Sequence, residues 1–237
     1  MDNKRKMSNE IIEGIFEALY LIFTLNPEIW SVIEVSFRVS LTSTFLAALV
    51  SLPIGSFIGL REFRGKRFLS NLINTFMGFP PVVMGLIVFL LLSAGGIFGS
   101  LGLLFSTTAM IIAQFLLAVP IIIGTGKAAI ESVDPALKET VLSLGANERQ
   151  LWWELIKHSK KSIIAGFLVA FGQAISEVGA VMIVGGNIRW ATRTFTTSIV
   201  LETRMGEFGM AIALGIILIS IAFILNYGLT RLQGSDK

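Results

Sequence analysis

The sequence contains no cysteine and one histidine, His158, among its 237 residues. Without cysteine the chain can form no disulfide, thiol nucleophile or thiolate metal site, and one histidine cannot supply a histidine cluster. Charged residues are also scarce, at 15% against about a quarter in ordinary globular proteins. Hydrophobic residues make up 54% of the chain and the mean hydropathy is +0.78, which predicts an integral membrane protein.

Long stretches lack charge altogether. No Asp, Glu, Lys or Arg occurs between Arg67 and Lys127, and Glu177 is the one charged residue between Lys161 and Arg189. Tracts of this kind predict membrane-spanning helices. We therefore expect an all-α, polytopic membrane protein with about five spans, at residues 33–60, 69–92, 106–126, 162–184 and 208–229.

The ends of the chain are more polar. Residues 1–32 read as a tail followed by a helix over Ile11 to Leu25 that lies in the membrane interface as an elbow, because Glu13 and Glu17 interrupt it. The alternative, a sixth span, would have to cross with fewer than the roughly 20 residues that a bilayer needs. Residues 231–237 form a tail after the last span.

The distribution of Lys and Arg sets the orientation. Most of them lie in 61–67, 127–161 and the C-terminal tail, which places these segments in the cytoplasm. The start of the first span then lies outside, which puts the basic patch Lys4 to Lys6 on the disfavoured side. The positive residues, and with them the net charge of +3, are explained by membrane topology, so no nucleic-acid partner is expected.

The polar segment 127–161 has a pattern of its own. Asp134 and Pro135 suit the start of a short helix, and Gly145 separates it from a second one. The second helix carries Trp152 and Trp153 beside charges, and two tryptophans exposed to solvent would favour aggregation. We therefore expect a partner to cover this loop.

Other candidate sites are weaker. The run from Gly124 to Lys127 lacks the first glycine and the final Ser or Thr of a phosphate-binding loop, so no ATP site, catalytic residue or metal site is expected in this chain. Glu177 is an ionisable residue in mid-span, near Gln173 and Ser176, and either forms a packing or gate hydrogen bond or lines a pathway that contacts substrate. The loop with Arg189, Arg193 and Thr194 is cationic and rich in donors, which suits an oxyanion or the acidic rim of another protein.

The segment 127–161 resembles the cytoplasmic EAA loop of ABC-importer permeases. Glu139 and Gly145 stand at the required offset, whereas Lys157 and His158 replace the closing Leu-Pro of that pattern. The resemblance implies a coupling helix, roughly 146–151, that docks onto a separate cytoplasmic ATPase subunit. The residues implied in this contact are Glu139, Gly145, Ala146, Asn147, Leu151, Trp152 and Trp153.

Two further segments narrow the resemblance. Residues 79–86 and 175–188 are similar to signatures of the molybdate, sulfate and tungstate permeases, and the second is most similar to the tungstate type. This implies a type I ABC-importer transmembrane domain over 33–230, a homodimer, and a binding protein that delivers a tetrahedral oxyanion. It also implies a multi-pass protein of the cell membrane, in contact with lipid, that binds no cofactor, since ATP and Mg belong to the ATPase. Across a two-fold axis, Gln173, Ser176, Glu177 and Asn187 would form the pathway or gate.

Two alternatives stay open at the level of sequence. Molybdate or sulfate could replace tungstate as substrate, because the three anions share charge and geometry. A self-contained channel or secondary transporter is the alternative from another class, although the chain shows no evident repeat and one intramembrane carboxylate.

Overall fold

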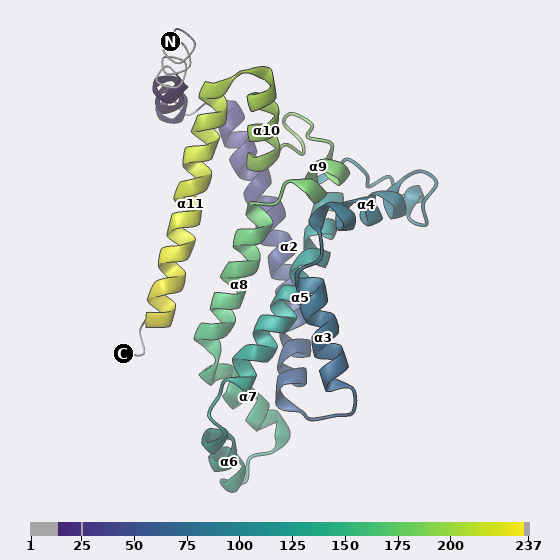
Figure 1. Cartoon of the computed structure of the whole chain (residues 1–237), viewed down its shortest axis with the longest axis vertical. Helices are drawn as coiled ribbons and strands as arrows, with labels where there is room; N and C mark the ends of the chain where they lie inside the picture. Colours follow the sequence, from purple (N-terminus) through teal and green to yellow (C-terminus); the bar gives the residue numbers. More distant parts are fainter. Residues whose placement is uncertain (1–13, 25, 235–237) are drawn as a thin grey trace, which may run out of the picture.

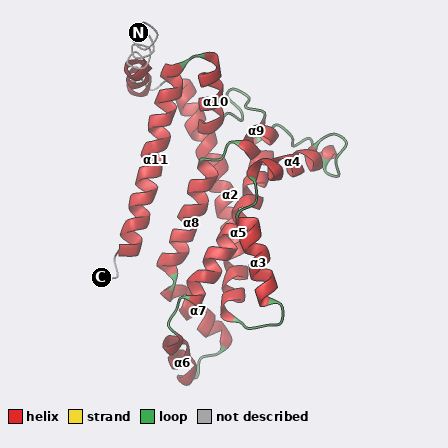
Figure 2. Ribbon diagram, in the orientation of Figure 1, coloured by secondary structure: helices red, strands yellow, loops and turns green. Residues whose placement is uncertain are grey.

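The computed structural model describes residues 14–24 and 26–234, with side chains up to residue 231. Within these ranges the chain is helical and contains no strand (Figures 1 and 2). The helices that follow a short N-terminal helix, Gly14–Phe23, are α2 Pro27–Leu60, α3 Lys66–Met77, α4 Pro81–Leu92, the 3-10 turn η1 Gly99–Leu101, α5 Thr107–Glu131, α6 Pro135–Ser143, α7 Glu148–His158, α8 Lys160–Ile175, α9 Gly179–Gly185, α10 Phe195–Met205 and α11 Phe208–Gly234.

Three of these helices, α2, α5 and α11, are each long and apolar enough to cross a membrane. Two helix pairs pass the same test only together, because each of their helices is too short alone; α3 and α4 are bent by 92° and α8 and α9 by 56°. Pro80 and Pro81 predict a break in the span at 69–92, and that break is confirmed. The span expected over 162–184 is bent instead of continuous. Pro81 begins α4 after the C-cap of α3 at Gly78, which explains the first break. The second break contains no proline and is held by contacts with other helices, described below.

The helices pack closely where small residues face a neighbour. A Cβ atom at Gly55 of α2 would lie 2.6 Å from the carbonyl oxygen of Ile123, and one at Gly59 would lie 2.8 Å from that of Lys127. Both glycines thus allow α2 to lie against the backbone of α5. Pro53, followed by these two glycines, predicts a kink or a close helix contact; the contact is present, and α2 continues through that proline as one helix.

The N-terminal helix, Gly14–Phe23, is too short to span a bilayer. Its buried Ala18 packs with Ala213 and Leu214 of α11. Figure 1 shows this helix near α10, at the end of the molecule opposite α6 and α7. The elbow helix predicted over Ile11 to Leu25 therefore exists over its described part, while its first residues and Lys4 to Lys6 lie outside the described residues.

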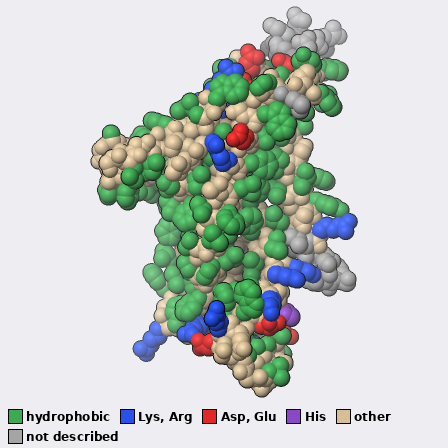
Figure 3. Space-filling model, turned by 180° about the vertical axis from the view of Figure 1, so that it is seen from behind, with side chains coloured by type: hydrophobic (Ala, Val, Ile, Leu, Met, Phe, Trp, Pro, Cys, Tyr) green, Lys and Arg blue, Asp and Glu red, His purple; other side chains and the backbone are tan. Residues whose placement is uncertain are grey.

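The surface of the molecule matches a membrane environment. Large apolar side chains are exposed along α2, α4 and α11, among them Phe45, Leu90 and Phe223. In the space-filling view, hydrophobic side chains cover the middle of the visible face, and Lys and Arg gather mainly towards the end that carries α6 and α7 (Figure 3). The positive-inside rule assigns this end to the cytoplasm.

Candidate functional site

The segment between α5 and α8 forms a helical hairpin made of α6 and α7. The Asp134 side chain accepts a 2.8 Å bond from the Ala136 N–H at the start of α6. At its end, Gly145 adopts φ +83° and donates to the Leu142 carbonyl, while the Ala146 N–H donates to that of Val141. This pair of bonds is the Schellman motif, which favours glycine because the position is left-handed. The predicted helix, glycine, helix arrangement is confirmed.

The second helix of the hairpin is fixed to the ends of the long helices. Leu151 and Leu155 of α7 are 4% and 3% exposed and pack against Ile130 of α5. Ser159 donates a buried 2.9 Å bond to the Ala129 carbonyl oxygen. The hairpin therefore forms one packed unit with the cytoplasmic end of α5 and, through the short turn at Ser159, with α8.

Two polar contacts add the end of α2 to this unit. Arg61, which follows α2, forms an ion pair with Glu148 at the start of α7. Lys138 of α6 donates a 3.4 Å bond to the carbonyl oxygen of Leu60. A displacement of the hairpin would consequently act on α2, α5 and α8 together.

The outward surface of the hairpin differs from the predicted one. Leu144 is 82% and Trp153 55% exposed, and Glu139 is exposed beside them. Leu151 instead lies inside the hairpin, so it supports this surface without forming part of it. Trp152 is half-buried and lines a groove against α2 and α8. Sequence reasoning missed Leu144, although an apolar residue directly before the left-handed glycine was a usable signal.

Glu177 lies in the break between α8 and α9 rather than in the middle of a continuous helix. Its Oε1 accepts a 3.1 Å bond from the Ala180 N–H, so the carboxylate caps the first turn of α9. Its carbonyl oxygen accepts a 2.6 Å bond from the Thr196 hydroxyl of α10. The hydrogen-bonding interpretation of Glu177 thus has a partner in the structure, a backbone N–H instead of the expected Gln173.

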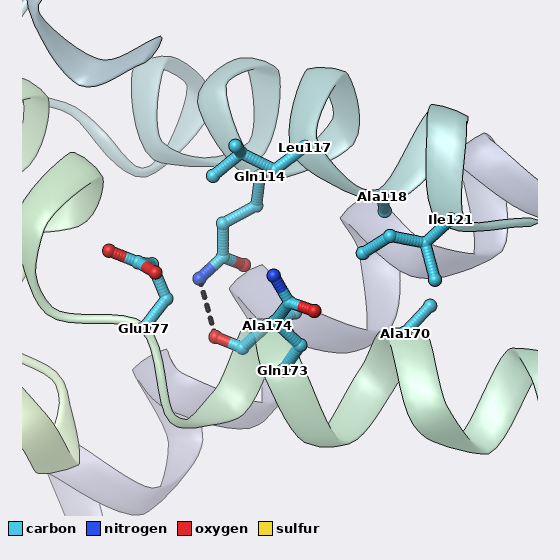
Figure 4. A pocket seen from close by; sticks show the side chains of 8 residues that line it. All are labelled: Gln114, Leu117, Ala118, Ile121, Ala170, Gln173, Ala174 and Glu177. Atoms are coloured by element: carbon cyan, nitrogen blue, oxygen red, sulfur yellow. Dashed lines mark hydrogen bonds between the residues drawn. The ribbon is translucent and has the colours of Figure 1, made fainter. Parts of the chain in front are cut away.

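A buried glutamine that sequence reasoning did not single out holds the same break. Gln114 of α5 is 3% exposed and donates a 2.8 Å bond to the Ala174 carbonyl oxygen near the end of α8. Its own side-chain oxygen lies 3.2 Å from the hydroxyl of Ser43 in α2, which donates to it. Gln114, Gln173 and Glu177 line one small hollow, where Figure 4 shows their side chains around the end of α8. A polar residue within an otherwise apolar span was the available signal.

The remaining pathway candidates lie around this hollow. Gln173 and Ser176 are exposed on the single chain. Asn187 follows α9 and donates a 3.3 Å bond to the Thr197 carbonyl oxygen, so it contacts the first turn of α10, as Glu177 does. Glycines on either side of the break differ: Gly179 allows close approach, since a Cβ there would lie 2.4 Å from Val82, whereas Gly172 has open space beside it.

The two arginines of the outer loop both form ion pairs with one glutamate, Glu28. Arg189 binds Glu28 of α2 through Nε at 2.9 Å and a terminal nitrogen at 2.7 Å, and Arg193 binds it at 2.9 Å. Hydrogen bonds to Glu28 raise the pKa of the Arg189 guanidinium. The loop is therefore not the free cationic surface that its sequence indicated.

Two further residues complete this outer cluster. Thr194 caps α10, because its N–H donates to the Thr197 hydroxyl at 2.9 Å. Glu202 of α10 lies 3.5 Å from Arg193, and its side chain is 7% exposed. Burial raises the pKa of the Glu202 carboxyl, and the attraction of Arg193 opposes that rise.

Comparison with known sequences yields consistent matches. The profile of the family described as "Binding-protein-dependent transport system inner membrane component" matches residues 51–233. A tungstate uptake system permease protein TupB of Peptoclostridium acidaminophilum is 40% identical over 94% of this chain and 98% of its own length. The TupB protein of Campylobacter jejuni is 39% identical over 94% of both chains. A sulfate transport system permease protein CysW of Synechocystis is 25% identical over 90% of this chain and 84% of its own length.

The fold also has a counterpart among solved structures. A chain of the MetNI methionine ABC transporter in an inward-facing conformation matches with a TM-score of 0.65 at 14% identity. The match covers 92% of this chain and 98% of the other. It shows that the two chains share a membrane fold.

Proposed function

The chain belongs to the family of binding-protein-dependent transport system inner membrane components, and from this premise we propose that it forms the membrane pathway of an ATP-driven importer of tungstate. The observation that carries the proposal is the identity of 40% and 39% to two tungstate permeases over nearly the whole chain. Sulfate permeases are more distant, at 25%. The chain is a multi-pass membrane protein and a transport component rather than an enzyme.

Two copies of the chain would form the pathway, together with two copies of an ATPase and an extracytoplasmic binding protein. The α6–α7 hairpin supports the ATPase contact, because it presents Glu139, Leu144 and Trp153 outwards at the end assigned to the cytoplasm. ATP and Mg would then be bound by the ATPase. The hairpin's attachment to α2, α5 and α8 would convert closure of the ATPases into movement of the spans, as alternating access requires.

The hollow at the α8–α9 break is our candidate for the gate. Gln173 and Ser176 are exposed there and can donate hydrogen bonds to an oxyanion, whereas the Glu177 carboxylate accepts a hydrogen bond from the N–H of Ala180. The outer Arg189 and Arg193 contribute less to attracting an anion, because both form ion pairs with Glu28, which offsets part of their charge. Discrimination between tungstate, molybdate and sulfate would reside mainly in the binding protein, since these anions share charge and geometry.

Reconstitution tests this function. Proteoliposomes that contain the chain with its ATPase should accumulate tungstate when ATP is inside and the loaded binding protein is outside. Excess molybdate or sulfate added to the binding protein measures which anion the system prefers. An ATPase variant without hydrolytic activity is the control. Tungstate entry that needs neither ATP nor the binding protein would show a channel instead of an importer.

A further inference from the structure

A second hollow lies on the side of the molecule formed by α2, α7 and α8. This groove has a volume of about 460 Å³, within the range of pockets that bind small molecules. Aliphatic and aromatic side chains line it, among them Leu49, Leu52, Ile164 and Phe167, and Trp152 of the hairpin lies at one end. The proposed transport function assigns no role to this groove.

The position of the groove along α2 relates it to the membrane surface. Ser56 lines it and lies five residues before Arg61, the first residue of the basic segment 61–67. At a rise of 1.5 Å per residue, the two positions are about 7 to 8 Å apart along the helix axis. Trp152 belongs to the hairpin at the cytoplasmic end, and tryptophan favours the boundary between headgroups and hydrocarbon. The groove thus begins at the cytoplasmic interface and extends into the membrane.

Positive charge stands at the cytoplasmic mouth. Lys160 lies four residues before Ile164 and therefore on the same face of α8. It is exposed and forms no ion pair among the residues that the structure describes, whereas the nearby Lys157 pairs with Glu154 at 3.2 Å. An ammonium group at this place would bind a phosphate headgroup and would favour one with net negative charge.

The groove faces away from the proposed pathway. Ile164 and Gln173 are nine residues apart on α8, which at 100° per residue places them on opposite sides of that helix. If Gln173 faces the two-fold axis, as the proposed function holds, the groove faces lipid and is not covered by the second copy. This step rests on the proposed function, while the apolar lining of the groove and the lysine do not.

We propose that the groove between α2, α7 and α8 binds one phospholipid of the cytoplasmic leaflet with an anionic headgroup. One acyl chain lies between α2 and α8, and the phosphate meets Lys160. Because Trp152 belongs to the α6–α7 hairpin, the bound lipid also contacts the unit that would transmit movement from the ATPase.

Fluorescence quenching tests this site in the full chain. Trp30→Phe, Trp153→Phe and Trp190→Phe together leave Trp152 as the one tryptophan. The protein is placed in nanodiscs of phosphatidylcholine that contain about one tenth phosphatidylglycerol with brominated acyl chains. We expect severalfold stronger quenching of Trp152 than with phosphatidylcholine brominated to the same extent. A chain that retains Trp190 instead is the control and should show no such preference.

Two variants separate the contributions. Ala48→Leu narrows the groove and should remove the preference for the brominated anionic lipid. Lys160→Gln should abolish the difference between headgroups while quenching by the acyl chains remains. Equal quenching by both lipids, unchanged in Ala48→Leu, would show contact with bulk lipid only and overturn the proposal.

A second copy in the groove is the other outcome that overturns it. In that case Trp152 would resist quenching by either lipid, and Ile164→Cys, in a chain without other cysteines, would form a cross-link between copies. The measurement needs neither ATP, the ATPase nor tungstate, so its failure leaves the proposed transport function standing.

Discussion

The side-chain amide of Gln114 in α5 donates a 2.8 Å hydrogen bond to the carbonyl oxygen of Ala174, the last residue but one of α8. In a continuous helix this oxygen would accept from the N–H four residues later. The helix ends first, and the Glu177 N–H reaches it only at 3.4 Å. Since Gln114 also accepts from Ser43, one chain of buried hydrogen bonds joins α2, α5 and the end of α8.

Gln114→Leu should destabilise the protein and loosen the break. The substitution removes the side-chain donor to the Ala174 carbonyl oxygen, at a cost of about 1 to 3 kcal/mol, while the Ser43 hydroxyl keeps its 3.0 Å bond to the Ser40 carbonyl oxygen. We expect a lower Tm of the purified chain and higher ATP hydrolysis by the complex without binding protein. Gln173→Leu is the matched control, because Gln173 lines the same hollow but is exposed. Equal effects of the two substitutions would argue against a role for the buried bond.

Glu177→Gln should preserve substantial transport, whereas Glu177→Leu should not. Glutamine keeps a side-chain oxygen that can accept from the Ala180 N–H, and leucine leaves the first turn of α9 uncapped, which costs about 1 kcal/mol. We expect the leucine variant to hydrolyse ATP without loaded binding protein. Basal and stimulated hydrolysis of the reconstituted complex provide the measurement. Wild-type coupling in the leucine variant would show that Glu177 does not contribute to coupling.

Gly145→Val should weaken binding of the ATPase severalfold, and Gly145→Asn should not. A Cβ at Gly145 would meet no atom within 4 Å, so the cost comes from the backbone at φ +83°. That cost is roughly 1 to 2 kcal/mol for a branched residue, and asparagine tolerates the left-handed region. The affinity of each detergent-solubilised variant for the ATPase measures this difference. If asparagine impairs binding as much as valine does, the ATPase requires a residue without a side chain at this position.

Glu28→Ala should lower the Tm by removing the partner of two arginines. The side chains of Glu28 and Arg193 are 16% and 12% exposed, so the substitution leaves a largely buried guanidinium with only the more distant carboxylate of Glu202, 3.5 Å away, at a cost on the order of 2 kcal/mol. Glu34→Ala provides the comparison, because its ion pair with Arg38 is long, at 3.7 Å, and exposed. Thermal unfolding of both variants in one detergent decides whether the outer cluster contributes to stability.

Glu202→Gln should alter how stability depends on pH. Because burial raises the pKa of Glu202 in the folded chain, its protonated form favours folding. This contribution is complete below the ordinary value of 4.5 and is lost as the pH rises through the raised folded value. The Tm of the glutamine variant relative to wild type should therefore increase over that interval and then level off. A difference in Tm that does not vary with pH would contradict this.

Local signals predicted the elements that depend on a few neighbouring residues. Asp134 and Pro135 marked the start of α6, and Gly145 marked its end, because capping and the left-handed turn use groups within four residues. The ion pair of Glu34 with Arg38 likewise follows from their spacing of one turn in the sequence. Sequence also located the apolar tracts, since hydropathy is a property of each segment by itself.

Contacts between distant residues decided the rest. Arg189 and Glu28 are 161 positions apart, so the sequence showed a free cationic loop where the fold contains an ion-paired cluster. Leu151 was expected on the docking surface and is buried, because the hairpin folds back onto Ile130.

The chain by itself determined a bundle of apolar helices with a capped cytoplasmic hairpin, because helix formation and membrane insertion follow from the composition of each segment. Tertiary structure alone decided where α8 ends. No proline or glycine interrupts it at Ser176, and the break persists because Gln114 and Thr196 satisfy the carbonyl oxygens of Ala174 and Glu177. Those partners come from other helices, so packing fixes the position of the candidate gate.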